Sequence, residues 1–119
     1  MQIFGATGPN IMLRYRVGHY QLLEVQTNTF AGQLSDDIGK WTTWKAQFIL
    51  ATTGGYVNLY RNGVLLVSAK GNTSGGNNSY LKQGIYSQEM NPPGIMTTYT
   101  RNLVLTSNSV KNSKTTFNF

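Results

Sequence analysis

The chain has 119 residues, enough for one domain with one hydrophobic core. Ten Lys and Arg residues against four Asp and Glu give a net charge of +6, which favours an anionic partner. The absence of cysteine excludes disulfides, a thiolate zinc site and a cysteine nucleophile. Because the chain has only four acids and one histidine, we expect no metal site and no cofactor.

The first third of the chain predicts strands separated by turns. Residues 10–16 alternate, with Ile11 and Leu13 on one face and two arginines on the other. Residues 20–26 are rich in side chains that favour a pleated sheet, so a second strand is expected there. Residues 32–40 contain glycine, serine and two aspartates, and they predict a loop.

The middle of the chain carries the clearest strand pattern. Residues 43–51 place tryptophan, alanine, phenylalanine and leucine on one face and polar residues mainly on the other. Residues 55–61 and 64–69 flank Asn62 and Gly63, a pair typical of a type I′ turn, in which both residues need positive φ. These two segments therefore predict a β-hairpin.

The last third predicts further strands between polar segments. Residues 70–79 are too rich in glycine and asparagine for regular structure, and residues 91–94 contain a Pro-Pro turn. Strands are expected over residues 80–88 and 95–106. Residues 107–119 are polar, and we expect a loose tail there in which Phe117 and Phe119 could dock onto the domain.

Seven to nine short strands without a helical stripe predict an all-β fold, an antiparallel β-sandwich. We expect the sandwich domain to span residues 1–106 and the tail to span residues 107–119. The longest apolar run, Val64–Val67, is far shorter than a membrane span, and no basic, apolar leader opens the chain. No membrane association is expected.

The segment 80–88 carries the strongest functional signal. In a strand, alternate residues share a face, and here one face would hold a set of polar and aromatic groups: Tyr80, Lys82, Gly84, Tyr86 and Gln88. Two phenols, an ammonium and an amide can grip a sugar, and the mid-strand glycine would let a ligand approach the backbone. Periodicity alone leaves open the alternative of a solvated outer face decorated with tyrosines.

Residues 80–88 (YLKQGIYSQ) resemble the Tyr-x-Lys-x-Gly-x-Tyr-x-Gln signature of alginate lyases and their relatives, the family 7 polysaccharide lyases, the glucuronan lyases and the heparin-lyase-like group. Residues 39–44 (GKWTTW) and 60–65 (YRNGVL) are similar to the run that precedes this signature in the heparin-lyase-like proteins. Residues 2–5 (QIFG) resemble a strand of the same superfamily. The resemblance covers residues 2–106 and implies a concanavalin-like jelly roll.

The resemblance implies cleavage of uronate polymers by β-elimination. Donor groups neutralise the carboxylate, a base removes the C5 proton, and an acid protonates the departing O4. Carried over by position, the resemblance makes Tyr86 the acid/base and Gln2 a neutraliser of the carboxylate. Lys82 and Gln88 would be subsite groups, and Tyr80 would be structural or would line the substrate site.

A tyrosine base needs positive charge close by, because an unperturbed phenol titrates near about 10. Lys82, on the same expected face as Tyr86, and Arg14 or Arg16 are the candidates to supply it. Lys82, Arg14 and Arg16 would then bind an anionic polysaccharide and lower the pKa of the Tyr86 phenol.

The chain also departs from the lyase pattern. The family's Gln-x-His strand would place histidine at position 4, where this chain has Phe4, and His19 is expected at a turn as a bystander. The family's Arg-x-Glu-Leu-Arg strand lies upstream of the Gln strand, which begins here at Gln2. The chain therefore resembles the C-terminal half of such a lyase. We expect a smaller sandwich, a homo-oligomer or second chain that completes it, or a piece of a larger protein.

The sequence also bears on alternative functions. Nucleic acid is disfavoured because the basic residues are scattered along the chain. A glycoside hydrolase would need two facing carboxylates, and the only candidates are Glu24, Asp36, Asp37 and Glu89. A non-catalytic glycan-binding module or an assembly protein, such as a virion or surface component, stays open, as does enzymatic activity itself. In each case we expect an extracellular or surface location.

Overall fold

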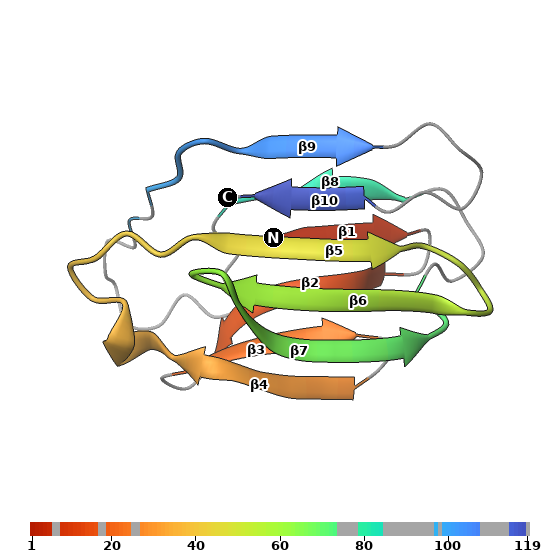
Figure 1. The fold of residues 1–119 in the computed structure, drawn as a ribbon, viewed down its shortest axis with the longest axis horizontal. Helices are drawn as coiled ribbons and strands as arrows, with labels where there is room; N and C mark the ends of the chain where they lie inside the picture. The colour runs from red at the N-terminus through yellow and green to blue at the C-terminus, as the bar shows by residue number, and fades with distance from the viewer. Residues whose placement is uncertain are drawn as a thin grey trace.

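The computed structural model describes residues 1–5, 8–16, 19–24, 27–73, 79–84, 97, 99–107 and 115–118. Within these residues the chain forms ten β-strands and one short 3-10 helix, arranged as two five-stranded antiparallel sheets. Figure 1 shows the sheets face to face, with β5, β6 and β7 nearer the viewer and β1, β2 and β3 behind them. This arrangement confirms the expected all-β antiparallel sandwich. None of the described residues belongs to a helix that could cross a membrane.

The first sheet has the strand order β4-β3-β2-β1-β8. Four of its strands follow one another along the chain and pair as a meander, and the fifth comes from much later in the sequence and pairs with β1. Their bounds are β1 (Gln2–Gly5), β2 (Gly8–Arg16), β3 (His19–Glu24), β4 (Thr27–Gln33) and β8 (Tyr80–Lys82).

The second sheet has the order β7-β6-β5-β10-β9. The chain reaches it through the 3-10 helix η1 (Leu34–Asp36) and then runs up and down through three consecutive strands. The strands are β5 (Trp44–Ile49), β6 (Gly55–Arg61), β7 (Val64–Gly71), β9 (Val104–Ser107) and β10 (Thr115–Asn118).

The hydrophobic core lies between the two sheets and draws on both of them. Every second residue of β5 and of β6 is buried, as the alternation in the sequence predicts. The buried apolar residues are Ile3, Ile11, Leu22 and Ala31 from the first sheet, and Trp44, Ala46, Phe48, Val57, Leu59 and Val67 from the second. Because one face of each sheet enters this core, the other faces are left for contact with solvent or ligands.

The hairpin predicted between β6 and β7 is confirmed. Asn62 has φ 49° and Gly63 has φ 82°, the two positive values that a type I′ turn requires. Asn62 Oδ1 also accepts a hydrogen bond from the Thr43 backbone N–H at 2.9 Å, and the Asn62 N–H donates to the Thr43 carbonyl at 2.8 Å. The turn is thereby tied to the segment that leads into β5.

The strand expected over residues 80–88 is shorter than predicted. Strand β8 ends at Lys82, Gln83 lies outside it, and Gly84 has φ 147°, a conformation that favours glycine. The prediction of a continuous strand is therefore wrong at Gln83 and Gly84, although exposure still alternates from Tyr80 to Gly84 as expected. Residues 85–88, including Tyr86 and Gln88, lie outside the described residues.

The tail and the preceding segment also differ from expectation. Thr115–Asn118 was expected to be loose, but it forms β10 and pairs with both β5 and β9. The strand expected over residues 95–106 begins only at Val104 among the described residues, and Asn102 just before it has a positive φ of 56°. A residue in the left-handed region interrupts extended pairing, which accounts for the late start of β9.

Two further expectations from the first third are corrected. Thr27–Gln33, for which no strand was predicted, forms β4, and the expected loop that follows contains the helix η1. His19, expected at a turn, is the first residue of β3, and its backbone pairs with Arg16 and Gln33. The sequence of β4 does not alternate apolar with polar residues. Its two apolar side chains, Phe30 and Ala31, are neighbours and therefore lie on opposite faces, Phe30 exposed and Ala31 buried.

Candidate functional site

Three of the predicted site residues, Gln2, Tyr80 and Lys82, lie together on the outer face of the first sheet. Strand β8 pairs with β1 so that Lys82 lies opposite Gln2 and Tyr80 lies opposite Phe4. Directly opposed residues of an antiparallel pair share one face of the sheet. Ile3, between Gln2 and Phe4, is buried in the core, so these four side chains belong to the opposite, outer face.

The ammonium group of Lys82 lies against two aromatic rings. Its Nζ atom is 4.0 Å from the centroid of the Phe4 ring and 5.2 Å from that of Tyr80. The two rings are 5.7 Å apart with an angle of 46° between their planes. Cation–π contacts of this kind hold a cation without neutralising it, because the rings carry no net charge. Among the described residues Lys82 has no carboxylate partner, so its charge is available to an anion.

Gln2 offers an amide donor beside this cation. Its Nε2 donates to the Sδ atom of Met12 at 3.0 Å, and Met12 is the residue opposite Gln2 on β2. A thioether is a weak acceptor, so a carboxylate of a ligand would compete with it easily for the amide N–H groups. Gln2 therefore presents a weakly held amide donor beside Lys82 on the outer face.

The two arginines differ in what the structure describes. Arg14 lies on β2 two residues beyond Met12 and so shares the outer face with it. Arg14 is half-buried and already takes part in an interaction. Of Arg16 only the backbone is described, at the end of β2. The structure thus brings Gln2, Lys82, Tyr80 and Arg14 to one face, while Tyr86 and Gln88 lie outside the described residues.

Phe4 is the site residue whose role the sequence did not reveal. By the resemblance it stands where the lyases have histidine; in this structure its ring contacts Tyr80 and the Lys82 ammonium. The sequence did hold one indication of this, since Phe4 is an aromatic residue that alternates with the core residue Ile3 and so lies on the outer face. Recognising its partners required the pairing of β1 with β8, which are far apart in the sequence.

The two acids whose side chains the structure describes, Asp36 and Asp37, are both engaged by one arginine. Asp36 Oδ2 lies 3.4 Å from Arg61 Nη1, and Asp37 Oδ1 accepts a hydrogen bond from Arg61 Nη2. The bond to Asp37 is the main cause that raises the pKa of Arg61. Within the described part of the chain, no group of three or more His, Asp or Glu side chains is placed to hold a metal ion.

Comparison with known families places this face in context. A family model described as polysaccharide lyase matches residues 3–109 of the chain. The chain belongs to the polysaccharide lyase family. This lyase match spans nearly all of β1 and the whole of β2 and β8, the three strands that carry the outer-face residues. No curated protein and no solved structure shows a significant match to the chain.

Proposed function

We propose that this member of the polysaccharide lyase family binds an anionic polysaccharide, a polyuronate or sulfated uronate chain, across the outer face of the first sheet. The observation that carries the proposal is the pairing of Gln2 with Lys82 across β1 and β8. It sets an amide donor beside an ammonium that has no carboxylate partner among the described residues, on an exposed face. An extended sugar chain that bears one carboxylate per residue matches such a face in charge.

The same pair of groups suits the first step of β-elimination. When a hydrogen-bond donor and a cation neutralise the uronate carboxylate, negative charge that develops at C5 is stabilised, and the C5 proton becomes more acidic. The base would be Tyr86, which the resemblance marks as the acid/base, and the same residue would protonate the departing O4. We propose alginate, glucuronan and heparin as the candidate polymers.

The contacts of Lys82 suggest how the site compensates for the lost histidine. Phe4 and Tyr80 restrict the ammonium group, so binding costs less side-chain entropy than it would for a free lysine. Arg14 adds positive charge on the same face. The site therefore retains the groups for carboxylate binding, and activity would depend on the proton transfer assigned to Tyr86.

The test measures turnover and binding separately. Wild type, Tyr86→Phe and Lys82→Ala would be incubated with alginate, glucuronan and heparin, and the ultraviolet absorbance of unsaturated uronate products would be followed. Retention on gels that carry the same polymers would measure binding. We expect Lys82→Ala to weaken binding by about tenfold or more, because a hydrogen bond to a charged group contributes about 1.5–3 kcal/mol.

A matched control separates a local effect from the loss of net charge. Lys70→Ala removes one positive charge from β7, in the other sheet, and should leave binding to these polymers nearly unchanged. Product that disappears in Tyr86→Phe would support the lyase activity. Retention without product would support the alternative, a glycan-binding domain without turnover. Equal losses in Lys82→Ala and Lys70→Ala would contradict the proposed face.

A further inference from the structure

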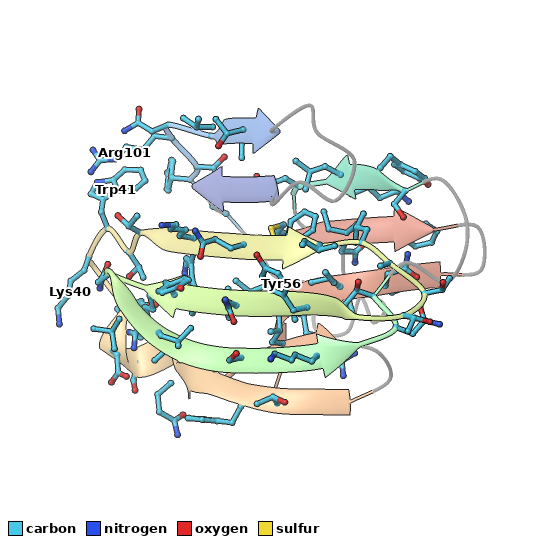
Figure 2. All side chains as sticks on the ribbon, turned by 45° about the vertical axis from the view of Figure 1, so that its right-hand side comes forward. Lys40, Trp41, Tyr56 and Arg101 are labelled. Atoms are coloured by element: carbon cyan, nitrogen blue, oxygen red, sulfur yellow. The ribbon has the colours of Figure 1, made fainter. Side chains whose placement is uncertain are left out.

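An exposed tryptophan and an arginine stack at one end of the second sheet. The guanidinium carbon of Arg101 lies 3.9 Å from the centroid of the Trp41 ring, and 55% of Trp41 is exposed to solvent. Figure 2 shows these two side chains next to each other, with Lys40 at the same end of the sandwich. Neither residue belongs to the face formed by β1, β2 and β8.

The fold brings this pair together from distant parts of the sequence. Trp41 lies in the segment that leads from η1 into β5, and Arg101 lies just before β9. Strands β5 and β9 are both antiparallel to β10, so they run in the same direction. The segments that precede them therefore lie at the same end of the sheet. Tyr99, which is 78% exposed, lies two residues before Arg101.

The electrostatic surroundings of the pair favour an anion. The five strands of the second sheet contain no Asp or Glu. The nearby acids Asp36 and Asp37 both bind Arg61. Among the described residues Arg101 forms no ion pair, and the Lys40 ammonium contacts only the backbone oxygen of Asp36, at 3.4 Å.

The stacked geometry is suited to a carboxylate or a sulfate. A guanidinium that stacks through its flat face keeps its N–H groups in the plane free to bind two oxygens of one anion at once. Stacking also restricts the long arginine side chain before a ligand arrives, which lowers the entropic cost of binding. The exposed indole offers an apolar surface to the ring of a sugar that carries the anion.

We infer that Trp41 and Arg101 form a second binding site, for one carboxylated or sulfated sugar unit, on the second sheet, away from the proposed outer face of the first sheet. The ligand class rests on the proposed function, whereas the site rests on the stack and on its unneutralised charge. With a site on each sheet, one molecule can hold two chains, or two stretches of one chain, at the same time. Such double attachment raises the overall affinity for a long polymer.

The two tryptophans allow a site-specific test. Trp41 is exposed and Trp44 is 7% exposed, so a ligand at the stack should shift the indole N–H NMR signal of Trp41 and leave that of Trp44 in place. Alginate-derived and heparin-derived tetrasaccharides would be the probes, and Trp41→Phe would assign the signal. We expect Arg101→Ala to weaken this response at least tenfold, and Arg101→Lys to restore it only in part, because lysine cannot bind two oxygens in the plane of a guanidinium.

Two control variants distinguish this site from the one proposed on the outer face of the first sheet. Lys70→Ala removes the same charge from the far edge of the second sheet, and Lys82→Ala alters only the first sheet, so the Trp41 response should survive in both. A Trp41 signal that stays in place with every tetrasaccharide would overturn the inference, whatever the retention on polymer gels shows for Lys82. A response that persists in Arg101→Ala would overturn it too. A Trp41 response together with unchanged polymer retention in Lys82→Ala would support this site and contradict the binding proposed for the outer face of the first sheet.

Discussion

Arg61 joins the end of β6 to the segment around η1. Its guanidinium binds both Asp36 and Asp37, and it also lies 6.0 Å from the centroid of the buried Trp44 ring. The side chains of Arg61 and Asp37 are only 17% and 8% exposed. The hydrogen bond to Asp37 raises the pKa of Arg61, whose guanidinium is charged at neutral pH in any case.

Replacing Arg61 should destabilise the protein strongly. In Arg61→Ala the carboxylate of Asp37 loses its cation in a partly buried place, which costs about 1–3 kcal/mol. Urea denaturation followed by circular dichroism would measure the loss. Arg101→Ala removes an arginine whose stacking partner is exposed, and it should change stability by less than about 0.5 kcal/mol. Similar losses in the two variants would contradict this account, and Asp37→Asn in the Arg61→Ala background should recover part of the stability.

At the level of elements, the strands that the sequence predicts best are those with strict alternation. Strands β5 and β6 place a buried residue at every second position, and the pattern is visible because each inward position is apolar or glycine. Strand β4 (TNTFAGQ) and strand β10 (TTFN) lack it. Their place in the sheets depends on pairing with neighbouring strands, which is long-range information that a local pattern does not contain.

The sequence predicted which residues belong to the candidate site, but it did not predict which of them contact one another. The signature and the Gln strand identified Lys82, Tyr80 and Gln2, and the structure places all three on one outer face. The contact of Lys82 with Phe4 follows from the register of β1 against β8, and a shift of one residue would have put Lys82 on the core face. The end of β8 at Lys82 could not be foreseen, because Gly84 fits both an extended and a left-handed backbone.

Asn62 has two roles in the turn between β6 and β7. The residue adopts positive φ, and its side-chain oxygen accepts a hydrogen bond from the Thr43 N–H. Asn62→Gly keeps the first role and removes the second, and we expect it to lower the free energy of unfolding by about 1 kcal/mol. Chemical denaturation would measure this change.

Asn62→Asp is the matched control for the side-chain bond. Aspartate retains an acceptor oxygen and tolerates the left-handed region, so this variant should remain within about 0.5 kcal/mol of the wild type. If glycine proved as stable as asparagine, the bond to Thr43 would contribute nothing, and the turn would be held by its backbone conformation alone.

At the level of the whole molecule, the sandwich has two different sides. Strands β4 and β7 are the edges of the two sheets on one side, and β8 and β9 are the edges on the other. Strand β7 exposes three consecutive apolar residues, with Val64 at 62%, Leu65 at 49% and Leu66 at 40%. An apolar edge strand with unpaired backbone groups is a template for pairing with another chain.

We therefore expect a second copy of the chain to associate through the β7 edge. Leu65→Lys places a charge in the middle of the apolar run, which opposes edge-to-edge pairing, and it should shift the molar mass measured by light scattering toward that of the monomer. Leu103→Lys makes the same change at a leucine that is 48% exposed just before β9, on the other side of the sandwich, and it should leave the assembly intact. A wild type that stays monomeric at high protein concentration would contradict the expectation. An equal effect of both variants would instead point to a general response to added charge.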